Sequence, residues 1–289
     1  MKLFTNEQIR AIDRYTIESE GIAAAELIER VAEGVVDEIT ARWRPTKPTI
    51  IFAGPGNNGA DALATARLLV GAGFSPKVYL FNIGGDKLSA DCAAARDYLL
   101  ESVPDIDFHE VLNSFKPPEL SSNHLIVDGL FGSGLREELQ GGFKALVQYI
   151  NEENATVVSI DLPSGMFGDW NPQLVNRNTI HATLTLAIQY PRICFFLPDN
   201  ADLIGEWKVL DIGLSEKAAA NTPVDFCLIE QRDVHRRLRH RKEFASKNDF
   251  GSAVLYAGSY GMMGAAVLAA RGAMRAGVGK LTVTAPKCG

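Results

Sequence analysis

Two spacings of apolar residues alternate along the first 230 positions of the chain. Short, continuously apolar runs, such as residues 50–53 and 125–127, are typical of strands buried on both faces of a parallel sheet. Between these runs, apolar residues recur at helical spacing. The alternation predicts the α/β doubly wound class, a Rossmann-like, mostly parallel sheet with helices on both faces. The expected strands are residues 49–53, 77–82, 106–109, 124–128, 156–161 and 182–189, with short ones at 207–212 and 225–229, and the expected helices between them are 60–72, 88–101 and 142–151.

Two amphipathic helices are expected before the first strand. Thr5 and Gln8 have the form of a capping box, a hydroxyl followed three residues later by an amide. A second helix over residues 22–43 places Leu27 and Val31 on one stripe. We interpret both helices as packing elements laid against the sheet or against a second subunit. They are therefore the candidate contact of a homodimer or higher homo-oligomer.

The charge of the chain is distributed unevenly. The net charge is −6, but residues 1–230 carry 18 Lys and Arg against 32 Asp and Glu, and residues 231–289 carry 11 against 3. The acidic first part argues against nucleic acid or an anionic membrane as a partner. Residues 231–247 hold seven Lys or Arg and two His, with one aromatic residue among them. A solvated helix that bridges two units is favoured there over a nucleic-acid patch.

Cysteine usage and hydropathy indicate a cytoplasmic protein. The four cysteines, Cys92, Cys194, Cys227 and Cys288, form no C-x-x-C pair. Such isolated cysteines fit a reducing compartment and argue against structural zinc or a disulfide framework. The N-terminus runs straight into charged helical sequence, so no signal peptide is expected. No apolar run approaches the roughly 18–20 residues that a membrane span needs.

A glycine-rich turn follows the first long strand. It reads Gly54-Pro-Gly-Asn-Asn-Gly-Ala-Asp61, and helix-forming residues resume at Ala60. A strand, tight turn and helix in this order point backbone N–H groups at whatever ligand sits there. Two amides and a carboxylate in one turn favour a ligand site. The alternative is an ordinary connection whose Asn and Asp serve turn chemistry.

Two further strands end in polar turns, Asp128-Gly-x-x-Gly-Ser-Gly134 and Asp161-x-x-Ser164-Gly165. In open parallel sheets, ligands bind at the carboxyl ends of strands, so three such turns on neighbouring strands would share one pocket. Their amide, hydroxyl and carboxylate oxygens suit a hard cation. Each aspartate alone could instead be a helix cap or turn acceptor. Gly54, Gly56 and Gly59 have G-x-G-x-x-G spacing, but Pro55 removes one backbone donor and Asn57 and Asn58 add side-chain amides, which disfavours an ordinary dehydrogenase.

These turns together resemble the hydrated-NAD(P)H epimerases. The matching stretches are the 54–61 turn, Asp128-Gly-Leu-Phe-Gly-Ser-Gly-Leu-Arg136, Asp161-Leu-Pro-Ser-Gly165 and the opening Thr5-Asn-Glu-Gln-Ile-Arg-Ala-Ile-Asp13. They span about residues 1–230. Ala60 and Ala62 replace two glycines of the family's first motif, and their methyl groups are expected to tighten the pocket without removing activity.

The resemblance implies a repair enzyme, an isomerase that interconverts the two C6 epimers of hydrated NADH or NADPH. It implies that Asn58, Asp128 and Ser164 hold one potassium ion. Asp161 is our candidate proton-transfer group, because it lies beside the ion turn and a carboxyl group there could shuttle a proton. The residues implied to contact the substrate are Asn57, Asn58, Gly59, Ala60, Asp61, Gly132, Ser133, Gly134, Leu135, Arg136, Glu137, Glu138 and Asp161.

The C-terminal residues 248–289 start a second strand–turn–helix–strand pattern. Residues 249–266 are similar to the start of the ribokinase-like, ADP- or ATP-dependent NAD(P)H-hydrate dehydratase. The expected organisation is an epimerase domain at 1–230, a basic linker at 231–247 and an incomplete ribokinase-like β-α-β fragment at 248–289. We expect no dehydration by this chain, since ADP and Mg²⁺ belong to a complete dehydratase domain. The fragment is expected to be loosely held or prone to self-association, because about 40 residues bury no core of their own.

Two other classes of function remain open. The domain could be a non-catalytic module that binds a nucleotide or a partner on the same fold, or an unorthodox NAD-dependent oxidoreductase. The presence of Asn58, Asp128, Asp161 and Ser164 favours the enzyme over the module. The proline and the two side-chain amides within the glycine turn disfavour the oxidoreductase.

Overall fold

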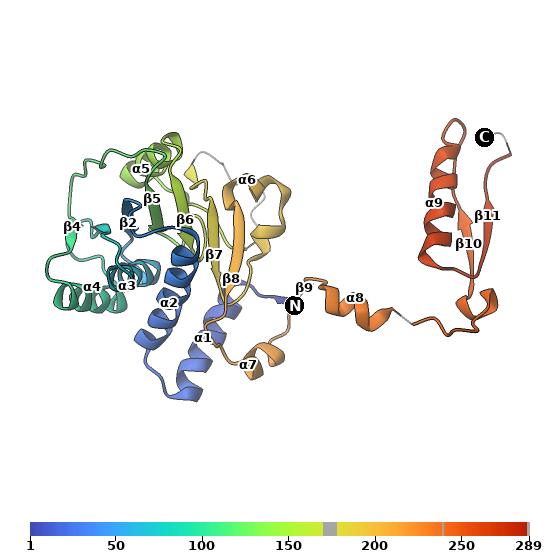
Figure 1. Cartoon of the computed structure of the whole chain (residues 1–289), viewed down its shortest axis with the longest axis horizontal. Coiled ribbons are helices and arrows are strands. Elements are labelled where there is room, and N and C mark those ends of the chain that lie inside the picture. Colours follow the sequence, from blue (N-terminus) through green and yellow to red (C-terminus); the bar gives the residue numbers. More distant parts are fainter. Residues whose placement is uncertain (170–177, 239, 288–289) are drawn as a thin grey trace. The chain divides into compact units, whose positions relative to one another are not determined.

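Seven parallel strands form the central sheet of the computed structural model (Figure 1). The structure describes residues 1–169, 178–238 and 240–287, so Cys288 lies outside it. The sheet order is β4-β3-β2-β5-β6-β7-β8. The strands are β2 (Thr49–Ala53), β3 (Lys77–Phe81), β4 (Asp107–Val111), β5 (Leu125–Gly129), β6 (Thr156–Ile160), β7 (Leu184–Ile188) and β8 (Glu206–Leu210). The chain runs outward in one direction from β2 and in the other from β5, so the strand order reverses between these two neighbours.

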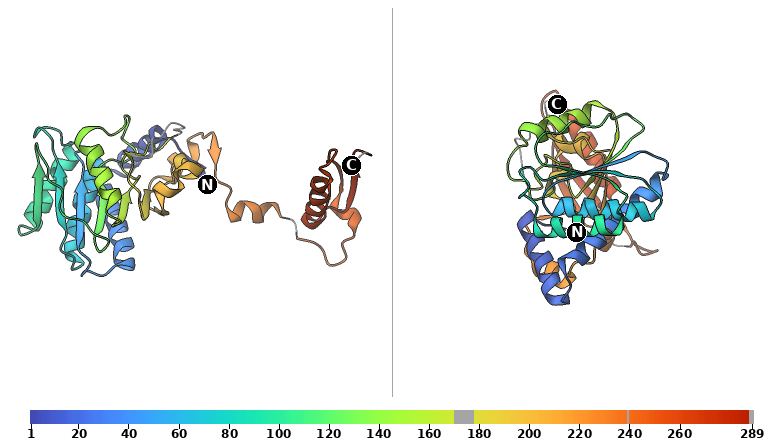
Figure 2. Two further views of the ribbon diagram at one scale, coloured as in Figure 1. Left: turned by 90° about the horizontal axis from the view of Figure 1, so that it is seen from above. Right: turned by 90° about the vertical axis from the view of Figure 1, so that its left-hand side faces the viewer.

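Helices cover both faces of the sheet, as the sequence predicts. The right-hand view of Figure 2 shows α5 on one side and the N-terminal helices on the other. The alternation of side chains along β2 explains this arrangement, since Ile51 packs into the core under α1–α4 and Phe52 into the core under α5. The helices are α1 (Asn6–Glu20), α2 (Ala24–Arg42), α3 (Asn57–Gly71), α4 (Ala90–Ser102), α5 (Gly141–Glu152), α6 (Ala201–Ile204) and α7 (Glu216–Asn221), with 3₁₀ turns η2 (Ile193–Phe196) and η3 (Pro198–Asn200).

Most element ends lie within two residues of the prediction, and α3 is the exception that matters. It begins at Asn57, three residues before the expected start. The turn before it is tight, because a Cβ on Gly54 would lie 1.8 Å from the carbonyl oxygen of Leu130. Asn57 and Asn58 therefore belong to the first turn of the helix and not to a preceding loop.

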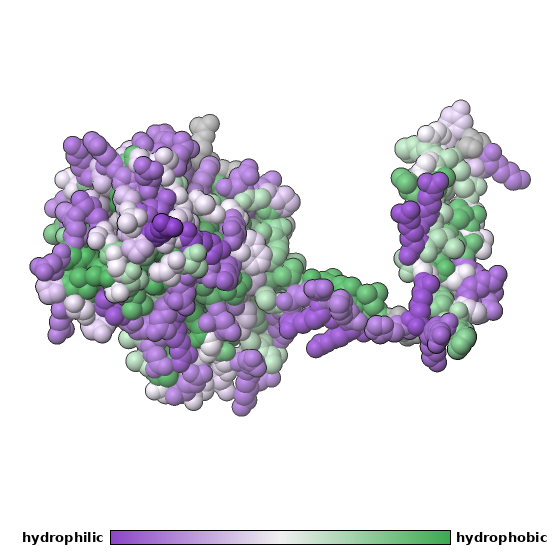
Figure 3. Space-filling view, viewed as in Figure 1, coloured by the Kyte–Doolittle hydropathy of each residue, from purple (hydrophilic) through white to green (hydrophobic). Residues whose placement is uncertain are grey.

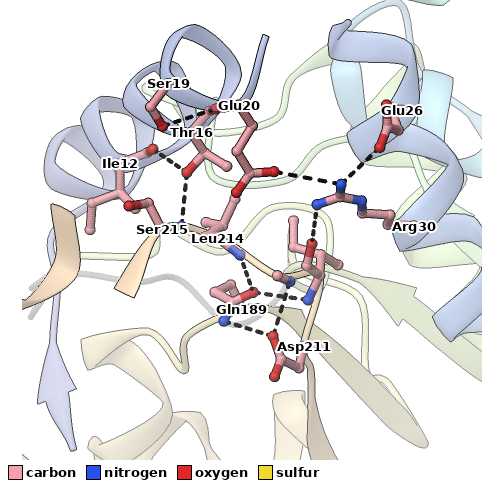
Figure 4. A network of polar contacts seen from close by, with 12 residues as sticks. Ile12, Thr16, Ser19, Glu20, Glu26, Arg30, Gln189, Asp211, Leu214 and Ser215 are labelled. Carbon is pink, nitrogen blue, oxygen red and sulfur yellow. Dashed lines mark hydrogen bonds and ion pairs between the residues drawn. The ribbon is translucent and has the colours of Figure 1, made fainter. Parts of the chain in front are cut away.

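The two N-terminal helices are fixed to the edge of the sheet by a polar network (Figure 4). The predicted capping box at the start of α1 is present. Further along α1, the Thr16 hydroxyl accepts a hydrogen bond from the Ser215 amide at 2.9 Å. On α2, the Arg30 guanidinium donates to the Ile212 carbonyl at 3.1 Å. Both partners lie in the loop after β8, so α1 and α2 pack against this sheet.

A short antiparallel pair joins the two ends of the first unit. Strand β1 (Lys2–Leu3) pairs with β9 (Phe226–Cys227). The Lys2 ammonium also donates to three carbonyls at the end of α7, those of Ala219, Ala220 and Thr222. This unit comprises Met1–Leu228.

The second unit, Ile229–Gly289, has the predicted strand–helix–strand form. Strands β10 (Ser252–Tyr256) and β11 (Lys280–Thr284) are parallel, and α9 (Met263–Ala276) connects them. Figure 3 shows apolar side chains on the outside of this unit. Among its described residues only Ala266 is a buried hydrophobic one, while Tyr256 is 78% exposed. The unit buries almost no core.

The basic segment 231–247 is less helical than expected. Helix α8 (Gln231–Arg237) ends at Arg237, and a 3₁₀ turn, η4 (Lys247–Phe250), begins at the other end of the segment. No residue of α8 is buried, so no tertiary packing extends the helix beyond its capping box at Glu230. In the described part of the chain, no helix is both long and apolar enough to cross a bilayer.

Candidate functional site

A cavity of about 890 Å³ opens at the carboxyl ends of β2, β5 and β6. These strands are neighbours at the reversal of strand order, which is where open α/β sheets bind ligands. The wall is made by α1 and α2, by residues 55–58, by residues 130–140, and by single residues after β6, β7 and β8. The three polar turns that the sequence singles out therefore meet at one place.

The floor of the first turn is backbone packed against backbone. Gly54 donates its N–H to the Gly129 carbonyl at 3.0 Å. A Cβ on Gly59 would lie 1.8 Å from the Gly54 carbonyl oxygen, so only glycine fits at either position. The N-cap of α3 is Gly56, which offers no side chain to cap the first N–H groups. The start of α3 is thus free of side-chain capping where it reaches the cavity.

Asn58 and Asp161 approach each other across Gly132. Both polar atoms of the Asn58 amide are buried and have no hydrogen-bond partner within the described residues. A Cβ on Gly132 would lie 2.8 Å from Asp161 Oδ2 and 3.3 Å from Asn58 Oδ1. The absence of a side chain at position 132 keeps the space between the amide and the carboxylate open.

Asp128 joins the second turn to the third. Its carboxylate is fully buried and accepts hydrogen bonds from Ser164 Oγ at 2.5 Å, Ser164 N at 2.8 Å and Ser159 Oγ at 2.8 Å. Burial raises the pKa of Asp128, and the bonds from Ser164 oppose that rise. A buried carboxylate, a hydroxyl and the unpartnered Asn58 amide are oxygen donors that fit a hard monovalent cation. No cluster of three or more His, Cys, Asp or Glu that could hold a metal occurs in the described ranges.

Asp161 has a strained backbone. Its φ is +65°, and the Leu162 amide donates to the Ile160 carbonyl at 2.8 Å, which closes a three-residue γ-turn. Its carboxylate accepts from Arg192 Nη2 at 2.5 Å and from the Ser133 amide at 2.8 Å. Non-glycine residues in this conformation cluster at functional sites.

Four charged residues of the cavity lining are absent from the predicted site, Arg10, Asp13, Asp91 and Arg192. Arg192 follows β7 and is only 2% exposed. Asp13 lies on α1 beside the buried Ile12. The signal that could have indicated Asp13 is a carboxylate bordering the apolar stripe of a helix. For Arg192 the signal is a charged residue soon after a strand, at the same edge of the sheet as the three turns.

Burial changes the acidity of two carboxyl groups on the wall. It raises the pKa of Asp13 to about 6, and the Asp161 charge adds to this while Arg192 and Arg10 oppose it. Burial also raises the pKa of Asp61 well above its usual value, with further increases from the charges of Asp161 and Asp13. Carboxyl groups whose pKa is raised by burial are suited to acid–base chemistry.

Most residues expected to contact the substrate line the cavity, namely Asn57, Asn58, Asp61, Asp161 and residues 132–138. Gly59 and Ala60 do not line it. Ala60 is fully buried in the core between the helices and the sheet. Ala62 lies there too, against Gly129. The expectation that these two methyl groups tighten the pocket is wrong, because α3 turns them toward the sheet.

A doubly wound sheet with polar, glycine-rich turns around a cavity at its point of reversal defines a ligand-binding protein of the Rossmann-like α/β class. Residues 24–194 match the family described as YjeF-related protein N-terminus, and the chain belongs to this family. This agrees with the resemblance read from the motifs.

The relatives fall into two lengths. The chain is 33% identical over 205 residues to a Limosilactobacillus reuteri protein named NAD(P)H-hydrate epimerase, covering 71% of this chain and 92% of that one. It is 33% identical over 281 residues to a Coxiella burnetii protein named bifunctional NAD(P)H-hydrate repair enzyme Nnr, covering 97% of this chain and 56% of that one. The chain thus spans about half the length of the bifunctional relatives.

A solved structure shares the fold. The crystal structure of the yeast protein YNL200c superposes with a TM-score of 0.57 at 22% identity, over 72% of this chain and 87% of that one. At this identity the likeness concerns the fold, a parallel α/β sheet covered by helices on both sides.

Proposed function

We propose that residues 1–228 form an epimerase that interconverts the R and S forms of hydrated NADH and NADPH. The observation that carries this proposal is the Asp161 carboxylate, held in a γ-turn and facing the unpartnered Asn58 amide across the gap at Gly132. The names of the relatives support the same substrate. The cavity, about 890 Å³, lies within the range of ligand sites of roughly 300–1,000 Å³.

The reaction needs reversible loss of the hydroxyl on ring carbon 6. When the C6–O bond breaks, its electron pair leaves with the oxygen, and the ring nitrogen supplies the pair that forms the N1=C6 bond. For this step Asp161 must carry a proton, which turns the departing hydroxide into water and leaves Asp161 as the carboxylate. Water then adds to the opposite face and returns its proton to Asp161. Opening and closing the ring is the alternative route, and it needs the same proton shuttle.

A potassium ion is proposed for the buried end of the cavity. Asn58 Oδ1, the Asp128 carboxylate and Ser164 Oγ would hold it, because these oxygens suit a hard monovalent ion and the Asn58 amide lacks a partner within the described chain. Bound there, the ion would supply positive charge that offsets the buried carboxylate and attracts the anionic nucleotide.

The diphosphate of the substrate is proposed to lie at the start of α3. The N-cap Gly56 provides no side-chain acceptor, and Gly56 and Asn57 both line the cavity. Helix N-termini with open N–H groups bind phosphate oxygens. The charged loop of residues 132–138 would cover the ligand from the other side.

The bifunctional relatives suggest a second activity for a longer protein of this kind. Dehydration of the hydrate, with ADP and Mg²⁺, is proposed only for a chain that carries a complete second domain. The described residues of the unit at 229–289 bury almost no core.

The test is to incubate one purified hydrate epimer with the protein, with and without potassium, and to follow the epimer ratio. We expect equilibration with the wild-type chain and about a hundredfold or greater loss of kcat in Asp161→Asn, since general acid–base groups contribute roughly 10²–10⁴-fold. Asp105→Asn, in an exposed position, is the matched control. Wild-type turnover by Asp161→Asn would exclude Asp161 as the proton shuttle. Binding of the hydrate without any change in ratio would identify a binding module.

A further inference from the structure

Arg192 is a buried cation whose guanidinium donates one hydrogen bond within the described residues, to Asp161. It follows Pro191 after β7, and its carbonyl accepts from the Phe195 amide at 3.1 Å, which fixes the backbone at the start of η2. The side chain is almost fully enclosed and lines the cavity beside Asp161. Its position is therefore set by the fold and not by a flexible loop tip.

Two of the three guanidinium nitrogens of Arg192 have no hydrogen-bond partner within the described residues. Nη2 is bound to Asp161 Oδ1, but Nε and Nη1 are buried and have no hydrogen-bond partner in the part of the chain that the structure describes. Leaving such donors unpaired costs free energy, and more for a charged group than for a neutral one. Because the residue lines the cavity, the missing acceptor is expected to come from the ligand.

The surroundings restrict the kind of acceptor. Three carboxyl groups, those of Asp13, Asp61 and Asp161, lie on the same part of the wall and influence one another electrostatically. A diphosphate placed among them would be repelled. A neutral oxygen that gains negative charge during the reaction would be tolerated at rest and stabilised as the charge develops.

The reacting hydroxyl meets this requirement. On the proposed function it must lie within hydrogen-bond distance of the Asp161 carboxylate, and Arg192 is already bonded to that carboxylate at 2.5 Å. An oxygen that exchanges a proton with Asp161 is therefore near the open N–H groups of the guanidinium. Arginine does not give up its proton in proteins, so its contribution would be electrostatic.

We propose that Arg192 binds the oxygen that leaves and returns at C6 of the hydrated ring, while Asp161 handles the proton. This inference rests on the proposed epimerase function and adds a second catalytic residue to it. As the C6–O bond breaks, the oxygen takes the bonding pair and its negative charge grows against the guanidinium. In the reverse direction the same contact positions the water that adds to this face of the ring.

The test compares two ligands that differ by this oxygen. Hydrated NADPH carries the ring hydroxyl, and NADPH lacks it. We expect the wild-type chain to bind the hydrate about tenfold or more tightly than NADPH, and Arg192→Ala to lose that preference while keeping its affinity for NADPH. Epimerisation should fall about 10²–10³-fold in kcat. Added guanidinium ion should restore part of the rate by entering the vacated space.

Two further variants distinguish the loss of the Arg192 contact from a general loss of stability. Arg192→Lys keeps a positive charge at the site and should retain the melting temperature with an intermediate rate. Arg42→Ala removes a guanidinium paired with Glu38 and Glu206 outside the cavity lining and should leave rate and ligand preference unchanged. Only a contact with the reacting oxygen predicts this pattern.

The outcomes are distinct. If the wild type prefers the hydrate and Arg192→Ala does not, the contact between Arg192 and the ring oxygen is supported. This holds even if no change of epimer ratio is seen and the proposed epimerase function fails. If wild type shows no preference, or if Arg192→Ala weakens both ligands equally, the proposal for Arg192 is overturned whatever the rate. Failure of guanidinium to restore any activity to a folded Arg192→Ala would also count against it.

Discussion

Asp13 is a carboxyl group whose ionisation changes near neutral pH. Burial raises the pKa of Asp13 from 3.8 to about 6, with Asp161 adding to the rise and Arg192 and Arg10 opposing it. Asp61 interacts with it from α3. Since the folded pKa lies above the unfolded one, stability is lost as pH rises through about 4 to 6, and the full loss persists above 6.

Asp13→Asn should therefore stabilise the protein, and more at alkaline than at acid pH. The expected gain is on the order of 2–3 kcal/mol at pH 8, and about half of that at pH 5, because the wild-type carboxyl is then mostly protonated in the folded state. Urea unfolding at the two pH values measures the difference. Asp105→Asn, on the surface, should show no such trend. A gain equal at both pH values would mean that Asp13 is not the titrating group.

The backbone at Asp161 also argues for function. A glycine would adopt φ of +65° without strain, yet an aspartate occupies the position and both of its oxygens are bonded. Strain of this kind persists where surrounding contacts over-determine it. Here those contacts come from Arg192 and from Ser133 on the loop after β5, so the carboxylate is oriented before any ligand arrives.

At the level of elements, β6 and β7 are each followed directly by a γ-turn. After β7, Gln189 has φ of +58° and the Tyr190 amide donates to the Ile188 carbonyl at 2.7 Å, which repeats the γ-turn of Asp161 on the neighbouring strand. The Gln189 side chain accepts from the amides of Ile212 and Leu214 (Figure 4). One residue therefore fastens the loop after β8, which in turn holds α1 and α2.

Gln189→Ala should destabilise the first unit by roughly 2–3 kcal/mol, because two partly buried amides lose their acceptor. Thermal unfolding followed by circular dichroism gives the shift in melting temperature. Gln148→Ala on α5 is the control, since the Gln148 side chain forms no hydrogen bond to another described residue, and its effect should be small. A similar change in both variants would show that the loop does not depend on Gln189.

The elements and the three turns could be predicted because their signals are local. Apolar runs at residues 50–53 and 125–127 mark β2 and β5, and the glycine-rich polar stretches after them mark the turns. Arg192 and Asp13 carry weaker signals, a charge three residues after the expected strand 182–189 and a charge beside the apolar stripe of a helix. The bond between Arg192 and Asp161 joins residues 31 positions apart, and a charged residue on a helix or loop is ordinarily exposed. Their place in the cavity wall follows only from the tertiary fold, which brings α1 and the segment after β7 to the same edge of the sheet.

The contribution of α1 and α2 to the cavity wall could not be predicted from the spacing of apolar residues either. Their apolar stripes predict burial, and Ile12 and Val35 are buried. The same stripes include Ile9 and Val31, which border the cavity. Periodicity shows which face of a helix is apolar, but it does not distinguish a face that packs on a sheet from one that closes a ligand site.

At the scale of the whole molecule, the cavity and the three core clusters lie within residues 1–228. A chain ending at residue 230 should therefore keep the melting temperature and the epimerisation rate of the full chain. A chain ending at residue 221 is the matched comparison, because it also loses β9, which pairs with β1, and the Thr222 carbonyl that Lys2 binds. Its melting temperature should fall.

The same pair of chains tests the second unit. Its strands β10 and β11 each leave one edge unpaired within the described residues, and Val254 and Leu268 are more than half exposed. Unpaired edges beside apolar surface favour association. Light scattering should show concentration-dependent association of the full chain and none for the chain ending at residue 230. Association of the shorter chain would instead place the contact in the first unit, where the amphipathic helices α1 and α2 are the candidate homodimer contact.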